Sequence, residues 1–419
     1  MKNRETLLDR FLKYVKIDTQ ADSESVTHPS TKGQLELARI VQQDFKNAGV
    51  QDIVLTDDGF LFGTISANLP QDHPNLNKVP ILGFLAHFDT ALETSGKNVN
   101  PQVVKNYNGE KIVLPNNQEE ILDPAEIPAL KACQGHTLIT TDGTTLLGAD
   151  NKAGIAEIVE LVYYLQENPD KLHGDLRLAI IPDEEIGVGA HRLNLKKFGA
   201  DFAYTIDGGS LGEVDFESFN GFQGKIKVKG NAVFPGYGKG AYLNAIQVLA
   251  EFISDMSPKL WPQHCEGRQG IWWVDKFKGD TSGAEVKIFL RDFEISGIES
   301  MKRMLNDLKD IISKKYPKAK IKVEIQETYR NYKDHLNKDP RVVEYAKKAM
   351  QQIGIVPKPN SVRGGNDACG LCANGLLSTN LFAGAHQMHS YLEWTSLEVM
   401  QKTVETIASL AEVWVREAK

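Results

Sequence analysis

The chain is poor in cysteine and contains no apolar run long enough to cross a membrane. Four of its 419 residues are cysteine, too few and too unevenly spaced for a disulfide framework. A membrane-spanning helix needs about 20 predominantly apolar residues, and no hydrophobic stretch approaches that length. We therefore expect reduced thiols and no membrane partner.

Long runs of like charge are also absent. The 55 acidic and 48 basic residues give a formal net charge of −7, without the basic clusters typical of nucleic-acid or anionic-lipid binding. Residues 1–16 follow an amphipathic helical pattern, whereas a signal peptide has an uninterrupted apolar core and a small-residue cleavage site. These features favour a cytoplasmic protein that acts on small molecules or peptides and binds no nucleic acid.

Two of the cysteines, Cys369 and Cys372, have the C-x-x-C spacing of redox and zinc sites. A structural zinc site needs two further ligands, and the sequence has no second such pair. Ordinary packing of a helix is therefore the favoured interpretation, with a redox or metal role as the alternative.

Polar side chains follow four predicted buried strands at the point where each strand ends. The strands are apolar runs at 79–86, 175–182, 203–206 and 376–382. Ligands of open α/β sheets bind beyond the carboxyl ends of the strands, so these polar groups should converge on one crevice. The groups are His87 and Asp89 after the first strand, Glu184 and Glu185 after the second, Asp207 after the third, His386 and His389 after the fourth, and Asp150 ahead of a long apolar-periodic helix.

Residues 213–326 have a different predicted order of strands and helices, βαββαβ, which indicates a separate inserted domain. The sequence therefore predicts an α/β protein with a mostly parallel central sheet flanked by helices, formed by residues 1–212 and 327–419. The insert is expected to be a ferredoxin-like α+β domain that serves as a lid or in dimerisation, so a homodimer is one expected assembly. The final helix, at about 396–417, is expected to open with a capping box formed by Thr395 and Glu398.

Histidine and carboxylates at strand ends are the groups that a hydrolytic metal site needs, because imidazole suits zinc and a carboxylate can bridge two ions. Each motif alone is weak: a lone H-x-D is more often an incidental strand end, and a Glu-Glu pair is usually a solvated turn. Their joint occurrence at the ends of four strands favours a metal site. If one carboxylate bridges, each of two ions receives a histidine and a terminal carboxylate; the ligand-type groups are His87, Asp150, Glu185, Asp207 and His389.

Six segments also resemble the peptidase T family of the aminoacylase/carboxypeptidase superfamily. They are AHFDT (86–90), TTDGTTLLGADNKAGIAEI (140–158), IPDEEIGVGA (181–190), YTIDGG (204–209), VRGGNDA (362–368) and NLFAGAHQMHSYLE (380–393). The resemblance covers the chain from its first helix to its end. It implies a zinc peptidase with two Zn²⁺ ions per chain that releases the N-terminal residue from tripeptides.

The resemblance also implies roles for individual residues. Asp150 corresponds to the bridging aspartate, and His87, Glu185, Asp207 and His389 correspond to the remaining ligands. Asp89 is expected to hold the His87 imidazole by a hydrogen bond. Glu184 corresponds to the general base, which takes a proton from water and passes it to the leaving amine.

Substrate-binding residues are expected close to this site. Arg363 and Arg291 match arginine positions of the family and suit carboxylate recognition, although a surface ion pair is an equally good interpretation of Arg291. Asn366 lies near the expected pocket. His386 is the rival to His389 for the last ligand position, but the family's ligand stands four residues before a glutamate, as His389 does, so His386 is expected to line the pocket or to be a solvated loop residue.

Several positions depart from the family's pattern, among them Asn366 and the AHQMH loop (385–389) near the expected pocket. Phe234 stands before Pro-Gly where the family carries a histidine that reaches the substrate carbonyl oxygen, and Asn151 replaces a common aspartate. Loss of one oxyanion donor typically lowers turnover by ~10²–10³. Alternative functions are therefore a metal- and peptide-binding protein with little turnover, or a hydrolase of another small amide such as a dipeptide or an N-acyl amino acid.

Overall fold

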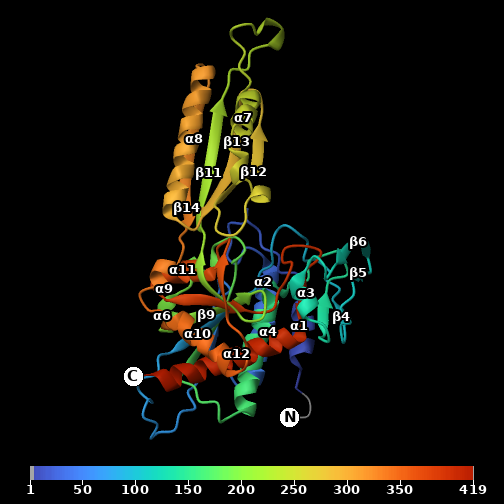
Figure 1. Ribbon diagram of the computed structural model, residues 1–419, viewed down its shortest axis with the longest axis vertical. Helices are drawn as coiled ribbons and strands as arrows, with labels where there is room; N and C mark the ends of the chain where they lie inside the picture. Colours follow the sequence, from blue (N-terminus) through green and yellow to red (C-terminus); the bar gives the residue numbers. More distant parts are fainter. Residues whose placement is uncertain (1–3, 419) are drawn as a thin grey trace. The chain divides into compact units, whose positions relative to one another are not determined.

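A computed structural model describes residues 4–418, which fold into two compact units (Figure 1). The first unit takes in the chain up to Phe216, then Asp334–Asn360, and then the chain from Asn366 onward. The second unit is Glu217–Lys333 together with the short segment Ser361–Gly365. Among the described residues, no helix combines the length and apolar character that a membrane crossing requires.

An eight-stranded sheet in the order β1-β2-β8-β3-β9-β16-β10-β15 forms the centre of the larger fold. Its four middle strands are parallel neighbours, as the apolar runs predict, and antiparallel strands flank them. The expected mostly parallel α/β sheet is confirmed. The middle strands are β8 (Leu176–Ile181), β3 (Leu82–His87), β9 (Phe202–Gly208) and β16 (Ser378–Phe382); the others are β1 (Gln51–Leu55), β2 (Leu61–Ile65), β10 (Glu213–Ser218) and β15 (Lys358–Val362).

Helices bury these middle strands, which is why the strands read as continuous apolar runs. Helix α4 (Ala149–Glu167) packs on β3 and β9, α12 (Leu397–Glu417) packs on α4, and α10 (Arg341–Gln352) packs on α12. All six residues of β3 are buried. Further helices are α1 (Leu7–Tyr14), α2 (Lys32–Ala48), α5 (Gly189–Arg192), α6 (Leu195–Phe198), α9 (Lys333–Leu336) and α11 (Asp367–Ala373).

One glycine sets how closely α4 approaches the sheet. A Cβ atom at Gly154 would lie 2.1 Å from the carbonyl oxygen of Ile206 on β9 and 2.3 Å from Oδ1 of Asn151. Only glycine fits this close contact without moving helix or strand. The contact keeps the start of α4, with Asp150, beside the end of β9, with Asp207.

The Asn- and Gln-rich stretch from about 95 to 135 carries small sheets of its own. Strand β4 (Gln102–Val104) pairs with β7 (Leu138–Thr140), which pairs in turn with β17 (Trp394–Ser396). Strands β5 (Ile112–Leu114) and β6 (Asn117–Leu122) form a separate hairpin, followed by α3 (Pro128–Ala132) (Figure 1).

The capping box expected at the start of α12 is wrong. The N-cap is Ser396, whose hydroxyl accepts a hydrogen bond from the Val399 N–H. Thr395 belongs to β17 and pairs with Ile139, so its backbone is committed to the strand ladder. The Glu398 carboxylate instead accepts the backbone N–H of Thr137 at 2.8 Å.

The second unit has the βαββαβ order that the sequence predicts. Its sheet runs in the order β12-β13-β11-β14, and all its pairings are antiparallel. Alternate residues of β13 are buried, and this inward row joins the apolar faces of the two helices in one core that includes Ile288, Val248 and Leu305. The elements are β11 (Asn220–Lys229), α7 (Ala245–Ser254), β12 (Ile271–Gly279), β13 (Gly283–Asp292), α8 (Ile295–Lys315) and β14 (Lys320–Tyr329) (Figure 1).

Candidate functional site

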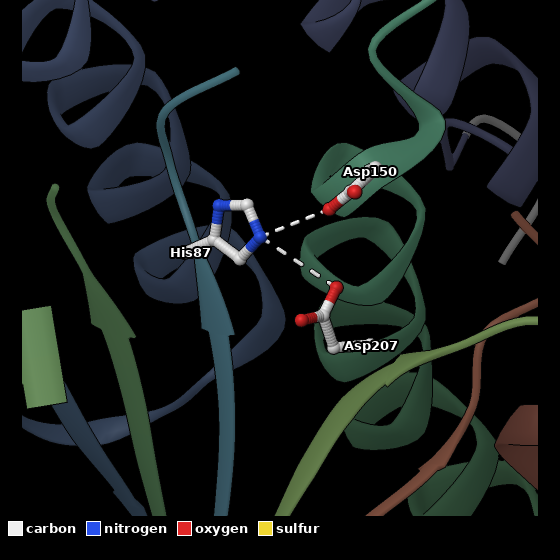
Figure 2. Close-up of side chains that lie close together, drawn as sticks. All are labelled: His87, Asp150 and Asp207. Atoms are coloured by element: carbon white, nitrogen blue, oxygen red, sulfur yellow. Dashed lines mark hydrogen bonds and ion pairs between the residues drawn. The ribbon is translucent and has the colours of Figure 1, made fainter. Parts of the chain in front are cut away.

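Three ligand-type side chains meet where β3, β9 and α4 come together (Figure 2). The Nε2 atom of His87, the last residue of β3, lies 3.0 Å from Oδ1 of Asp150 and 3.5 Å from Oδ1 of Asp207. His87 is buried, and the two carboxylates come from the start of α4 and the end of β9. A nitrogen and two carboxylate oxygens thus face one small space.

A second group of the same composition shares Asp150. The Nε2 atom of His389 lies 3.3 Å from Oδ2 of Asp150 and 3.2 Å from Oε2 of Glu185. In each group the ligand-type atoms all lie within 4.8 Å of one another. One oxygen of Asp150 therefore faces each group, which is the arrangement of a carboxylate that bridges two ions.

The loop that carries Asp150 is held by a buried glutamate. The Glu393 carboxylate accepts the backbone N–H groups of Leu147, Gly148 and Asp150 at 2.7, 2.8 and 3.0 Å. Gly148 has φ +82°, a left-handed conformation that glycine adopts without strain. In the sequence, Glu393 was used only for its spacing from His389. Its three hydrogen bonds reach a loop some 245 residues away, and no local sequence pattern predicts them.

Asp89 supports both the first histidine and the Glu-Glu turn. Its two carboxylate oxygens accept the backbone N–H groups of Glu184 and Glu185 at 3.0 and 2.9 Å. The Nδ1 atom of His87 lies 3.1 Å from the Asp89 backbone oxygen and 3.4 Å from its carboxylate. Asp89 therefore orients His87 mainly through its backbone and orients the two glutamates through its side chain.

Asp183, which precedes the two glutamates, anchors the same turn from the other side. It is buried and has φ +61°, an uncommon conformation for a residue other than glycine. Its carboxylate accepts the Ser30 N–H and the Gln34 side-chain amide and lies 3.1 Å from Nδ1 of His28. This anchor could not be predicted, because residues 28–34 have no sequence motif of their own.

Burial and crowding of the carboxylates shift their pKa values. Desolvation, reinforced by the nearby Asp150, raises the pKa of Glu185 to about 8 and that of Asp207 to about 6. At Asp150 burial acts in the same direction, but hydrogen bonds from His389 and His87 outweigh it and hold the pKa below its usual value. Oε1 of Glu185 is buried without a hydrogen-bond partner. These groups fit a bound dication, which would stabilise their ionised forms.

Glu184 belongs to neither group of ligand-type atoms. Desolvation and the neighbouring carboxylate of Asp367 raise its pKa well above the usual range. A carboxyl group of this kind holds a proton more readily than a solvated one, which suits an acid–base role at neutral pH.

The two histidines of the last loop have different surroundings. His386 stacks on Trp394, with ring centroids 4.3 Å apart, and burial lowers its pKa to about 4. It belongs to neither ligand-type group, whereas His389 belongs to the second. Stacking on Trp394 therefore holds the His386 ring outside both groups, and the geometry favours His389 as the ligand.

The remaining sequence-predicted residues do not join either ligand-type group. Arg363 donates to the Gln269 carbonyl at 3.1 Å and to the Gly267 carbonyl, and its guanidinium lies 5.1 Å from the Phe219 ring. Arg291 donates to the Phe222 and Leu290 carbonyls. Its guanidinium lies near the rings of Trp273, Phe289 and Tyr329.

Asn366, in the first unit, donates its side-chain amide to Asp215 at 3.4 Å. Asn151 accepts the Gly154 N–H through Oδ1 at 3.2 Å, a cap for the regular part of α4 that an aspartate would supply equally well. Phe234, in the second unit, is 72% exposed, and its ring packs only loosely on Tyr237, with centroids 5.7 Å apart. The thiols of Cys369 and Cys372 are both buried on α11.

Comparison with known proteins decides the family. The model of peptidase family M20/M25/M40 matches residues 140–413. The chain belongs to this peptidase family. It is 41% identical over 411 residues to a protein named peptidase T from Geobacillus thermodenitrificans, with 98% of each chain covered. The expectation of a peptidase is therefore confirmed.

Solved structures share the fold. The aminopeptidase PepT from Bacillus cereus matches with a TM-score of 0.74 and 23% identity, covering 98% of this chain and 99% of the other. A dinuclear metal-binding peptidase of family M20 from Bacillus subtilis, YXEP, matches with a TM-score of 0.64 and 12% identity over 98% of both chains. At these identities the matches establish the fold alone, a mixed α/β fold with a mostly parallel central sheet and helices.

Proposed function

We propose that the chain is a di-zinc aminopeptidase that releases the N-terminal residue from tripeptides. The observation that carries this proposal is the position of Asp150, whose two oxygens face two separate groups, each completed by one histidine and one carboxylate. Full-length similarity to a relative named peptidase T supports the substrate class.

Two zinc ions fit the donors present. His87 and Asp207 would hold one ion, His389 and Glu185 the other, and Asp150 both. Imidazole nitrogen with carboxylate oxygen is a common ligand set of catalytic zinc. The unpartnered Oε1 of Glu185 and the raised pKa values of two buried carboxyl groups support a cation as the missing partner.

The chain's own residues supply orientation and proton transfer. When bound, two zinc ions would lower the pKa of a water molecule and polarise the scissile carbonyl. Glu184 takes the proton of the attacking water and returns it to the leaving amine nitrogen, which needs a carboxyl group with a pKa close to neutral. Asp89 holds Glu184 and Glu185 in position by accepting hydrogen bonds from their backbone N–H groups.

Substrate recognition by Arg363, Arg291, Asn366 and His386 remains part of the proposal. Both arginines donate to backbone carbonyls, so recognition of a substrate carboxylate requires the guanidinium to exchange one of its partners for the substrate. An alanine variant that raises KM for a free tripeptide, but not for its C-terminal amide, would identify the arginine that binds the carboxylate.

A substrate panel tests the proposed specificity. Ala-Ala-Ala should be cleaved to alanine and Ala-Ala, while N-acetyl-Ala-Ala-Ala, which lacks a free amine, should remain intact. A chelator should abolish cleavage and added Zn²⁺ should restore it. Cleavage of the acetylated peptide, or of N-acetyl-alanine in preference to Ala-Ala-Ala, would contradict aminopeptidase specificity.

Phe234 favours a second candidate function, a metal- and peptide-binding protein with little turnover. A phenyl ring cannot donate a hydrogen bond to a developing oxyanion, and this one is exposed on the loop between β11 and α7. Tight binding of tripeptides to the metal-loaded protein without release of any residue would support this candidate over the first.

A further inference from the structure

The two histidines of the ligand-type groups use their two ring nitrogens in the same way. In each, Nε2 faces carboxylate oxygens of its group, and Nδ1 faces an oxygen outside it. For His87 the outer oxygens belong to Asp89. For His389 the outer oxygen is Oε2 of Glu93, 3.4 Å from Nδ1. Metal-binding histidines commonly donate their other N–H to such an oxygen, which fixes the tautomer and the ring plane.

The segment that carries Glu93 is also attached to the backbone of His389. Thr94, which is buried, donates its hydroxyl to the His389 carbonyl at 2.7 Å. His389 has φ +62°, an uncommon conformation outside glycine. The same segment is bonded to Gln20, whose side-chain amide donates to the carbonyls of Ala91 and Thr94, both at 3.0 Å. Residues 91–94 are therefore a fixed support that reaches His389 at two atoms.

The two histidines differ in how firmly packing holds them. The His87 side chain is 1% exposed, whereas that of His389 is 39% exposed. The surrounding core restricts the ring of His87. The ring of His389 has far less packing around it, so its orientation depends more on the groups that bond to it.

We propose that Glu93 is a positioning residue for the metal ion held by His389, with Thr94 fixing the backbone of the same ligand. The inference rests on the proposed two-metal function. It predicts an asymmetric effect: loss of the Glu93 carboxylate weakens the ion bound by His389 and Glu185 and leaves the ion bound by His87 and Asp207 unchanged.

Metal titration of the apoprotein, by competition with a chromophoric zinc chelator, measures this effect directly. Loss of an outer hydrogen-bond partner of a metal ligand typically lowers affinity ~10–100-fold. Because the Glu93 side chain is 66% exposed, we expect the lower end, about 10-fold, for Glu93→Ala. Glu93→Gln, which keeps an acceptor oxygen, should lose less. Glu119→Gln, at an exposed glutamate of β6, is the matched control and should change neither affinity.

Thr94→Val tests the backbone attachment separately, since it removes the hydroxyl with little change of shape. It should also weaken one ion only. Because Glu93 is exposed, the thermal midpoints of its apoprotein variants should stay within about 2 °C of the parent. An unchanged midpoint separates a metal-specific effect from a general loss of stability.

Double variants assign the effect to one ion. With His389→Ala, which already removes the second ion's histidine, Glu93→Ala should have no added effect on zinc affinity. With Asp207→Asn, its effect should persist in full, since the two changes act on different ions.

The outcomes separate this inference from the proposed function. If the parent protein binds no zinc, or one ion, the two-metal function fails before any variant is compared. If the parent binds two ions and Glu93→Ala binds both as tightly as the parent, or weakens both equally, Glu93 has no positioning role and the two-metal function stands.

Discussion

The carboxylate of Glu393 accepts the backbone N–H of Asp150 at 3.0 Å, across 243 residues of sequence. It accepts two more N–H groups from Leu147 and Gly148, so a single buried side chain satisfies the three donors that lead into α4. This bond links the loop of His389 to the residue that both ligand-type groups share.

Removal of this acceptor should destabilise the protein markedly. Glu393→Ala leaves three backbone N–H groups without their acceptor, and each unsatisfied buried group costs ~1–3 kcal/mol. We expect the free energy of unfolding to fall by about 3 kcal/mol or more, measured by urea denaturation. Glu398→Ala removes the acceptor of one backbone N–H and should cost about 1 kcal/mol. Equal losses in the two variants would contradict this role of Glu393.

The two histidines of the last loop should differ in metal binding. His389→Ala should retain about one zinc ion per chain, because its group loses its only nitrogen ligand. His386→Ala should retain both ions, since His386 stacks on Trp394 and belongs to neither group. Elemental analysis after dialysis against low zinc makes the comparison. The reverse result would assign the ligand to His386.

A buried glutamate on α4 predicts a pH dependence of stability. The carboxylate of Glu157 is fully buried, and burial raises its pKa well above the usual 4.5 although a hydrogen bond with Thr403 acts in the opposite direction. The native state therefore keeps this proton at a pH where the unfolded chain has released it. The resulting contribution to stability is complete below about pH 4.5 and is lost progressively as the pH rises.

Glu157→Gln removes this ionisation while keeping the shape of the side chain. Its free energy of unfolding, relative to the parent, should be higher at pH 8 than at pH 5 by more than about 1 kcal/mol. Urea denaturation of the metal-free proteins at both pH values measures the difference. Glu119→Gln should show no such trend, and a parallel pH dependence of parent and Glu157→Gln would exclude a protonated Glu157.

Phe234→His tests whether the exposed aromatic position limits turnover. If a histidine there reaches the substrate carbonyl oxygen, as the family's pattern implies, kcat should rise, by up to ~10². KM should change little, because the interaction forms mainly in the transition state. Tyr237→His, on the same exposed loop, is the control. An unchanged kcat in Phe234→His would show that this position does not limit the reaction.

The parts of the fold and site that follow from local pattern were predictable from sequence. Apolar runs followed by His87, Glu185 and Asp207 indicated parallel strands, and parallel strands bring their carboxyl ends to one edge. The βαββαβ order of the elements in residues 213–326 indicated a ferredoxin-like domain. In both cases the periodicity of a single segment determines which face it buries.

The supports of the site were not predictable in this way. Glu393, Asp183 and Glu93 act through partners 100 to 300 positions away, and a lone carboxylate in a loop has no periodicity to mark it. The cap of α12 was misplaced by one residue for a related reason. Thr395 and Ser396 are both good caps, and only the pairing of Thr395 with Ile139 removes it from the helix start.

The central claim has two parts: Asp150 is shared by two metal sites, and the neighbouring Glu184 is the general base. Elemental analysis and an Ala-Ala-Ala assay on the same preparations of parent and Glu184→Ala test it most directly. We predict about two zinc ions per chain in both proteins and a fall in kcat of ~10²–10⁴ in the variant, with KM little changed. A parent without bound metal, or a Glu184→Ala variant that cleaves as fast as the parent, would contradict the account.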